Sequence, residues 1–422
     1  MNNFKYSNSI LINLIISSII PFLIWGPFFP DLIVSISSLF FLYYIFKNKD
    51  FYYLSNKPFL IFCIFCIYCI FLSIFVAEDM MLSFESSLFY FRIGVFSCFI
   101  WYLIDKDRSI LTYFYYVLTI CFLALVVDGY FQYFTGENLL GYKLSGIRVS
   151  SFFGDELIMG SYLSRLFPLL FALFLVKKKK KFEIYFIALL FILVDVLIYM
   201  SAERASFFFL NISTVFIIIL IKEYQRFRLV TFILAIICVF ALSLNSPDII
   251  DRMFKTPAKA MGLIESESES ESPKKPAIFS SHHDDLIRTA YNMFKGKPIL
   301  GRGPKMFRVI CEDKKYAVGP RPCMAHPHNF YVQLLAETGL IGFLFLISAL
   351  GYVLFASLRQ FKSIIFKQKR PLTDYQVCLL AGLLISVWPL STNGNFFNNW
   401  LMIVYSLPVG FYLQSIYSKN NK

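Results

Sequence analysis

The stretch His326-Pro-His-Asn-Phe-Tyr-Val-Gln-Leu-Leu-Ala-Glu-Thr-Gly-Leu340 opens a long apolar run, which predicts a membrane helix over residues 329–358. The chain has only 4 histidines, and two of them, His326 and His328, stand at the start of this helix. Polar side chains then recur every fourth residue and project from one face, at Asn329, Gln333 and Glu337. Such groups in a membrane helix indicate a functional site.

The composition is that of a membrane protein. Apolar residues make up 58% of the 422-residue chain and aromatic residues 19%, above the apolar share of an ordinary soluble domain. A bilayer core requires roughly 20 apolar residues per helix, and the chain offers about twelve such runs. They lie near residues 9–28, 29–47, 58–77, 83–104, 110–134, 157–176, 182–200, 205–221, 229–246, 329–358, 375–391 and 400–417. We therefore expect an all-α integral membrane protein with about twelve transmembrane helices.

The basic residues predict the orientation of these helices. A formal net charge of +13 would suit nucleic-acid binding, but the cations fall into short clusters between apolar runs, as they do on the cytoplasmic side of membrane proteins. With the N-terminus inside, every large cluster falls on that side: Lys47 to Lys57, Lys106 and Arg108, Lys177 to Lys181, Lys222 to Arg228, Arg359 to Arg370, and Lys419 and Lys422. We expect both termini in the cytoplasm and no nucleic-acid partner. Only Lys143, Arg148 and Arg204 break the pattern.

Residues 247–328 form one long outer loop between the ninth and tenth predicted helices. The loop divides the chain into three parts, with helices 1–9 in residues 1–246 and helices 10–12 in residues 329–422. Within it, Glu265 to Ser272 alternates glutamate and serine. That tract cannot bury a core, which predicts disorder.

The rest of the loop has helical features. Apolar residues have helical spacing over residues 284–295 and again around 306–311, on either side of the turn-rich segment Pro298 to Pro304. This pattern predicts a small, mainly helical cap over the outer end of the bundle. Cys311 and Cys323 share this oxidising side, so they could form a disulfide.

The two histidines are candidates for acid–base chemistry. We expect Pro327 at the first helical position, with His328 and Asn329 in the first turn, where free backbone donors favour an anion. The positive helix end lowers the pKa of a histidine, which keeps the imidazole neutral and able to accept a proton near pH 7. A lone histidine in this place could simply cap the helix. The pair and the polar stripe below it favour a functional role.

Arg204 lies in Met200-Ser-Ala-Glu-Arg-Ala-Ser206, between two strongly apolar spans. Its guanidinium either pairs with an acid such as Glu203, as a structural clip, or is free to bind phosphate oxygens with its two-pronged donor edge. The sequence leaves both possibilities open.

Other charged residues have candidate partners nearby. Asp155 and Glu156 could pair with Arg148 or with Arg165. A further arginine inside a predicted span, Arg92, must either meet an acid such as Glu85 or Asp128 or line a polar cavity. Several cations make the cap basic, which suits an anionic substrate: Arg288, Lys297, Arg302, Lys305 and Arg308.

No metal or cofactor motif is evident. The triplet Cys63, Cys66 and Cys69 lies inside an apolar run, where thiols are ordinary small hydrophobes. His282 to Asp285 could be a metal site, but a polar loop is the commoner meaning of such a run. The chain also lacks a glycine-rich phosphate loop and a Gly-x-Ser-x-Gly elbow. We expect metal-free chemistry without a cofactor.

Taken in order, four motifs resemble the O-antigen ligase and polymerase superfamily over nearly the whole chain. They are Arg148-x-Ser-x-Phe-Phe-Gly-Asp-Glu-x-x-x-Gly160, Ser201-Ala-Glu-Arg-Ala-Ser206, Pro298-Ile-Leu-Gly-x-Gly-Pro-x-x-Phe307 and His326-Pro-His-Asn-x-x-x-Gln-x-x-x-Glu-x-Gly339. The resemblance implies a bacterial inner-membrane glycosyltransferase with a GT-C-like bundle and a periplasmic active site. Such enzymes take a glycan from undecaprenyl pyrophosphate and pass it to a hydroxyl with inversion, without metal.

The resemblance also implies roles for individual residues. His328 matches the family's histidine before asparagine and would act as the general base. Arg204 and Arg148 match arginines that would hold the diphosphate, and Arg288 is a weaker match to a loop arginine. The remaining polar residues of the last motif would contact substrate: His326, Asn329, Gln333 and Glu337. Two features depart from the family pattern. The glycine that the family usually has in the Arg204 motif is Ala202 here, and the Glu/Ser tract is unlike the family's structured loop.

Three functions are compatible with these motifs. We favour an O-antigen ligase that transfers a glycan to lipid A-core in the membrane, with an O-antigen polymerase, whose acceptor is a second carrier-linked glycan, as the alternative. A polysaccharide transporter or flippase would also need a basic cavity, but it tends to show paired repeats and broken helices, which the sequence does not display.

Overall fold

The computed structural model describes residues 2–177, 180–260, 263–264 and 281–418. Throughout these ranges the regular structure is helical, apart from two isolated β-bridges, Glu137 with Lys143 and Ser145 with Arg148. The predicted disorder of Glu265 to Ser272 and the last lysines of the chain lie outside the described residues.

Nine helical segments of the described chain are long and apolar enough to cross a membrane. They are α3 (Phe28–Asn48), α4 (Lys57–Phe75), α5 (Met80–Leu88) with α6 (Phe91–Lys106), α7 (Ser109–Thr135), α8 (Met159–Val176), α9 (Lys181–Met200), α11 (Gln225–Asn245), α16 (Phe330–Ile365) and α18 (Asn399–Tyr417). Three shorter apolar segments accompany them: α1 (Asn2–Ser17) with α2 (Ile19–Trp25), α10 (Arg204–Leu220) and α17 (Asp374–Ser386). The chain is an all-helical, multi-pass membrane protein. Each of the twelve predicted runs lies on one of these segments, but three fall short of a full span.

The interior of the bundle is built around α8 and α18. Buried residues make up 83% of the apolar window of α8 and 72% of that of α18, against 17% for α11 and 22% for α16. Helix α8 packs along α17, and α18 packs along α6. Cys66 and Cys69 of α4 lie in the same apolar core, as their packing interpretation predicts. The outer helices α11 and α16 therefore leave most of their apolar surface for lipid.

Helix α16 is not the continuous helix that its apolar run predicts. Gly339 has φ 65°, and a Cβ there would lie 2.2 Å from the carbonyl oxygen of Ile299. The turn at Pro298 packs into this break: the Leu340 amide donates to the Pro298 carbonyl (2.9 Å), and the Gly303 amide donates to the Glu337 carbonyl (2.7 Å). The break thus comes from a tertiary contact between backbones, which hydrophobic periodicity does not report.

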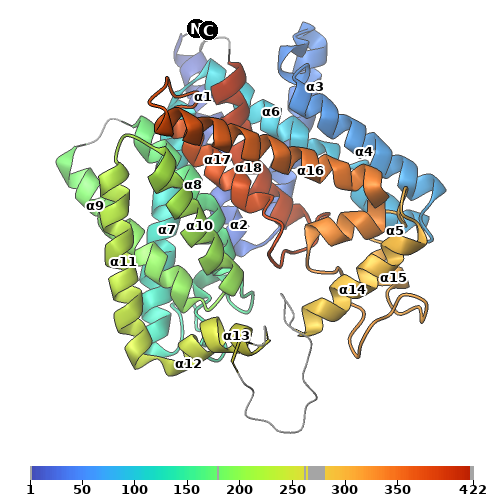
Figure 1. Ribbon diagram of the computed structural model, residues 1–422. Helices are drawn as coiled ribbons and strands as arrows, with labels where there is room; N and C mark the ends of the chain where they lie inside the picture. Colours follow the sequence, from blue (N-terminus) through green and yellow to red (C-terminus); the bar gives the residue numbers. More distant parts are fainter. Residues whose placement is uncertain (1, 178–179, 261–262, 265–280, 419–422) are drawn as a thin grey trace.

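The two chain termini lie side by side at one end of the molecule, and the long loop lies at the opposite end (Figure 1). This outer segment comprises α12 (Pro247–Ile250), a π-helical turn (Asp251–Lys255), α13 (Thr256–Ala260), α14 (Ser281–Gly296) and α15 (Phe307–Ile310). Short 3₁₀ turns occur elsewhere, at Phe51–Leu54 and Ser151–Phe153. The two predicted cap helices are confirmed as α14 and α15.

The cap has its own small apolar core. It joins Leu286 and Met293 of α14 to Phe307 and Ile310 of α15, and it includes Ala336 of α16. Cys311 and Cys323 form a disulfide beside this core, so the predicted pairing is confirmed. The cap, defined here as residues 281–328, is therefore attached to the first half of α16.

Two arginines inside the bundle differ from the sequence prediction, Arg228 in its burial and Arg92 in its ion-pair partner. Arg228, assigned above to a cytoplasmic cluster, has a fully buried side chain whose Nη1 and Nη2 atoms bond Asp195 at 2.9 and 3.2 Å. Arg92 pairs with Asp31 at 2.5 Å, not with Glu85 or Asp128. The partner of each arginine lies on another helix. A partner is needed because a charge inside the bundle is stable only when an opposite charge neutralises it there.

Candidate functional site

The chain turns sharply just before α16. Asn329, not a residue near His326, is the N-cap, and its side chain accepts hydrogen bonds from the amides of Tyr331 (3.0 Å) and Val332 (3.1 Å). The helix begins at Phe330, so the predicted first position at Pro327 is wrong by three residues. His328 has φ 57°, and its carbonyl accepts from the amide of Asn393 at 2.7 Å. An amide cap at Asn329 is a stronger start signal than the preceding proline.

All four histidines of the chain lie in one cluster. The ring centroids of His326 and His328 are 4.1 Å apart, and His283 of α14 meets His328 edge-on at 5.1 Å. His282 stacks beside His283 at 5.7 Å. Sequence analysis assigned the last two to a polar loop. Within the described ranges, no group of three His, Cys, Asp or Glu side chains is arranged to hold a metal ion.

Burial keeps the imidazoles of His283, His326 and His328 neutral by lowering the pKa of each. It is the largest cause that lowers the pKa of His283, to about 4, and of His326, to about 3, and neighbouring imidazoles lower both further. The pKa of His328 is also lowered, first by burial and then by His282. The predicted direction is confirmed, but its main cause is burial and not the positive end of a helix. At neutral pH these rings can therefore accept a proton.

Arg204 begins α10 with an exposed side chain. Its guanidinium makes no hydrogen bond or ion pair with any residue in the described ranges. The carboxylate of Glu203 is instead used to join two helices, because it accepts from the amides of Gly160 (2.7 Å) and Ser161 (3.1 Å) at the start of α8. Of the two alternatives left open by the sequence, the structure favours the free guanidinium.

Two further arginines lie around the start of α10. Arg148 donates through Nε to the Ser201 carbonyl (3.2 Å) and through Nη2 to the Leu157 carbonyl (3.1 Å). Asp155 and Glu156 pair with neither Arg148 nor Arg165. Arg252, in the π-helical turn, donates through Nε to the Ala202 carbonyl at 3.1 Å.

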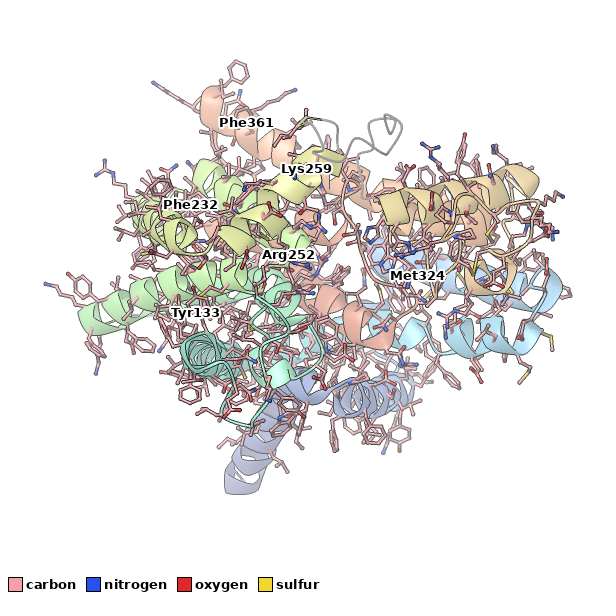
Figure 2. All side chains as sticks on the ribbon, turned by 90° about the horizontal axis from the view of Figure 1, so that it is seen from below. Tyr133, Phe232, Arg252, Lys259, Met324 and Phe361 are labelled. Carbon is pink, nitrogen blue, oxygen red and sulfur yellow. A yellow bond between two sulfur atoms is a disulfide. The ribbon has the colours of Figure 1, made fainter. Side chains whose placement is uncertain are left out.

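The charges of these three residues act on one another. Burial is the largest cause that lowers the pKa of Arg148, Glu203 opposes it, and then Arg252 and Arg204 lower that pKa further. We call Arg148, Arg204 and Arg252 the arginine cluster. Arg252 was not among the site residues predicted from the sequence. Its signal was a cation just beyond the outer end of a predicted span, and Figure 2 shows it toward the middle of this end of the molecule.

The charge of the arginine cluster reaches the histidines. After burial and the neighbouring histidines, the charge of Arg204 is a further cause that lowers the pKa of His283. His283 is also the ring that meets His328. Arg204 and His328, which are far apart in the sequence, are thus brought to the same end of the bundle by α10, α14 and the turn before α16.

The polar stripe of α16 is buried and bonded within the protein. Gln333 Nε2 donates to Glu337 Oε2 (3.0 Å) and to Asn395 Oδ1 (2.9 Å). Glu337 Oε1 accepts from the Phe307 amide at 3.1 Å, and Asn329 Nδ2 donates to the Pro389 carbonyl at 2.9 Å. The predicted common face is confirmed. The hydrogen bonds of this face hold the cap and the loop before α18 against α16.

Residues 186–347 match a protein family described as O-antigen ligase. Over this region the chain is similar to the O-antigen ligase family. No curated protein matches it. Members of that family are glycan-transferring enzymes. The matched region contains Arg204, Arg252 and the four histidines, whereas Arg148 and the loop at Asn393 lie outside it.

Two more features of the family region bear on substrates. Arg288 of α14 forms an ion pair with Asp284 at 2.7 Å, which stays within the helix. Between α10 and α11 lies an apolar cavity of about 270 Å³, whose lining includes Phe207, Phe240 and Phe254. Phe207 follows Arg204 by one helical turn, and Phe254 follows Arg252 by two residues. The cavity therefore approaches the arginine cluster along the lipid-facing side of the bundle.

Proposed function

We propose that this protein is an O-antigen ligase that transfers a glycan from undecaprenyl pyrophosphate to a sugar hydroxyl of lipid A-core, with inversion and without metal. The observation that supports it best is the free guanidinium of Arg204 beside a cluster of neutral imidazoles. Anion binding and proton acceptance are the two tasks of such a transfer, and here they occur side by side.

The arginine cluster binds the diphosphate of the donor. Arg204 offers its full set of donors, and Arg148 and Arg252 each retain donors that their carbonyl bonds do not use. A guanidinium binds phosphate oxygens in a bidentate manner and keeps its charge at all relevant pH values. As the bond between the sugar carbon and the diphosphate oxygen breaks, its electron pair leaves with the diphosphate, where the cluster stabilises the added charge.

His328 acts as the base. The acceptor hydroxyl oxygen attacks the anomeric carbon from the side opposite the diphosphate, which inverts that carbon, and its proton passes to the neutral His328 imidazole. His326 contacts the substrate beside it. Asn329, Gln333 and Glu337 hold the turn and its neighbouring loop in place, so in this proposal they act on the substrate through His328. Arg288 binds substrate only if its ion pair with Asp284 opens.

The polyprenyl chain of the donor fits the apolar cavity between α10 and α11. Its aromatic lining faces the lipid side, and its outer end approaches the arginines that hold the diphosphate. The enzyme lies in the bacterial inner membrane with both termini in the cytoplasm and the site in the periplasm. The basic clusters at the end that carries the termini support this orientation.

The decisive experiment uses the purified enzyme in lipid nanodiscs with a carrier-linked glycan, in the presence of chelator. Lipid A-core is one acceptor and a second carrier-linked glycan is the other. Product on lipid A-core supports the ligase, whereas product on the carrier would show a polymerase instead. Loss of activity on chelation would exclude the metal-free mechanism.

Variants test the residue roles in the same assay. We expect His328→Ala and Arg204→Ala to lower the rate by at least about 100-fold, since each removes a group that acts in the transition state. Arg252→Gln should weaken donor binding more than it lowers the rate at saturation. Arg321→Ala, which removes an exposed cation elsewhere on the cap, is the matched control and should leave the rate unchanged. Full activity of His328→Ala would remove the base assignment.

A further inference from the structure

A second cavity, of about 470 Å³, lies between α5–α6, the cap and the loop before α18. Its volume is in the range of small-ligand sites. Polar and charged side chains from all three parts line it: Glu85, Arg92, Lys305, Arg308, Asn395 and Asn398. None of these residues belongs to the arginine cluster, and none is assigned a role by the transfer described above.

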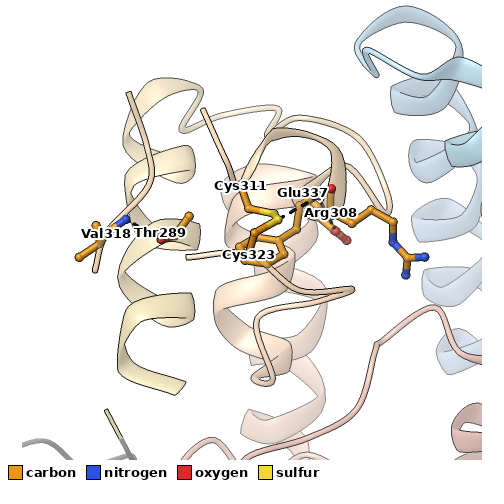
Figure 3. Close-up of a disulfide and its surroundings, with 7 residues drawn as sticks. Thr289, Arg308, Cys311, Val318, Cys323 and Glu337 are labelled. Carbon is orange, nitrogen blue, oxygen red and sulfur yellow. Dashed lines mark hydrogen bonds between the residues drawn. A yellow bond between two sulfur atoms is a disulfide. The ribbon is translucent and has the colours of Figure 1, made fainter. Parts of the chain in front are cut away.

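Two of the lining cations have no partner. Lys305 and Arg308 form no hydrogen bond or ion pair through their side chains with any described residue, and Arg308 Nε is buried without an acceptor. Figure 3 shows the Arg308 side chain extending away from the disulfide toward the neighbouring helices drawn in blue. Arg92, by contrast, is neutralised by Asp31. The free positive charge of the cavity therefore belongs to Lys305 and Arg308.

Holding these two cations close together is electrostatically unfavourable. Burial is the largest cause that lowers the pKa of Lys305, and the charge of Arg308 lowers it further. Glu85 and Glu337 act in the opposite direction but form no ion pair with Lys305. Like charges kept adjacent in a half-buried place, with donors free, are typical of a site for a doubly charged anion.

The charge of one lining residue reaches the histidine cluster. After burial and His328, the charge of Arg308 is among the causes that lower the pKa of His326. Arg204 acts on the cluster through His283, and Arg308 acts on it through His326. The imidazoles are thus within electrostatic reach of two separate groups of cations, one contributed by α10 and the π-helical turn and the other by the cap.

We propose that this cavity binds the acceptor, and that Lys305 and Arg308 hold a phosphate group of the acceptor glycan while the amides of Asn395 and Asn398 contact its hydroxyls. The proposal rests on the glycan transfer proposed above. A phosphate on the acceptor could come from a phosphorylated lipid A-core sugar or from the diphosphate of a carrier-linked glycan. The chemistry that the cavity recognises is the same in both cases.

The test separates donor from acceptor kinetics in the nanodisc assay. We expect Lys305→Gln and Arg308→Gln each to raise the KM for acceptor by about 10-fold, the usual effect of losing one charge-assisted hydrogen bond. The KM for donor should stay unchanged, and Arg321→Gln should change neither. An unchanged acceptor KM, or an equal rise in both constants, would overturn the proposal.

A substrate-side measurement needs no mutation. Phosphatase-treated lipid A-core should show a raised KM with the unmodified enzyme, and Arg308→Gln should then cause little further loss. If the carrier-linked glycan is the acceptor instead, the same variants should raise its KM, and inorganic pyrophosphate should compete with it. An undiminished affinity for dephosphorylated lipid A-core together with no effect of pyrophosphate on carrier-linked acceptor would also contradict the proposal.

The outcomes for the two proposals are distinct. If the unmodified enzyme transfers glycan to no acceptor, both the proposed function and the proposed acceptor site are wrong. If transfer occurs and depends on Arg204, but the acceptor KM is indifferent to Lys305 and Arg308, only the acceptor site fails. Thermal unfolding of each variant distinguishes loss of binding from loss of fold.

Discussion

His283 lies in ring contact with His328, yet its sequence neighbourhood marks it only as part of a polar run. Arg252 is similar, because it becomes a site residue only when the π-helical turn places it beside Ala202. Residues of this kind join the candidate site only through contact with a residue that is distant in the sequence. His328 and Arg204 could be singled out as candidates from the sequence, because each stands in an ordered motif at the end of an apolar run.

The histidine pKa values predict a distinctive pH dependence. Because the pKa of His283 is held near about 4, that of His326 near about 3 and that of His328 below its usual value, the base stays neutral through the physiological range. Transfer should therefore proceed at a constant rate from about pH 8 down to about pH 6 and decline only in more acidic solution. An inflection at or above the ordinary histidine value of about 6.5 would contradict a buried neutral base.

The same shifts link folding to pH. In the unfolded chain, histidine takes up a proton as the pH falls through about 6.5, whereas the folded protein does not until the pH approaches about 4. The unfolded state then binds more protons, so stability should decrease from about pH 6.5 downward. His283→Phe should make this decrease shallower in a thermal-unfolding series, provided that His283 is neutral when folded.

At the scale of elements, the break in α16 is the feature that builds the site. Gly301 and Gly339, both with positive φ, let the turn of the cap and the helix approach backbone to backbone. The first half of α16 then carries the polar stripe, while the second half, from Leu340 to Ile365, runs through the outer part of the bundle. The cap, which carries the four histidines, is thereby held against the first half of α16.

Glycine substitutions within α16 test this contact. Gly339→Ala places a methyl group 2.2 Å from the Ile299 carbonyl oxygen in an unfavourable backbone region, so the turn must move. We expect the free energy of unfolding to fall by about 3 kcal/mol. Transfer activity should fall as well. Gly351→Ala is the matched control, since a Cβ there meets nothing within 4 Å. Thermal unfolding of both variants in detergent measures the difference.

A second element-scale contact is the ion pair between α9 and α11. Arg228 is fully buried, bonds both oxygens of Asp195 and also donates to Thr214 Oγ1 at 2.7 Å. Arg228→Ala leaves the Asp195 charge buried without a partner, which should cost about 3–5 kcal/mol of stability. Arg226→Ala removes an exposed cation two residues away and should cost less than about 0.5 kcal/mol. Equal melting temperatures for the two variants would show that the buried pair is not important.

At the scale of the whole molecule, both termini lie at one end, and the long outer segment lies at the other (Figure 1). Alkaline phosphatase is active only in the periplasm. We therefore expect a phosphatase fused after Ala317 of the cap to be active and one fused after Phe366, at the end of α16, to be inactive. The reverse result would place the histidines in the cytoplasm, where the proposed donor glycan would not reach them.

Much of the architecture follows from local sequence. Apolar runs, caps such as Asn398 before α18, and the spacing of Asn329, Gln333 and Glu337 predict which segments are helical and which face is polar. Such features depend on the bilayer and on neighbours within a few residues. The disulfide was foreseen as a possibility, because both cysteines lie on the outer side, but spacing alone did not establish it.

Local sequence could not predict the contacts that assemble the site. The break at Gly339, the partner of Arg92 and the burial of Arg228 each depend on a segment at least thirty residues away. The same is true of the histidine cluster, which joins α14 to the turn before α16. Composition and periodicity therefore decide that this is a multi-helix membrane protein, whereas packing between distant segments decides which side chains meet, because a side chain's neighbours in space are chosen by the fold as a whole.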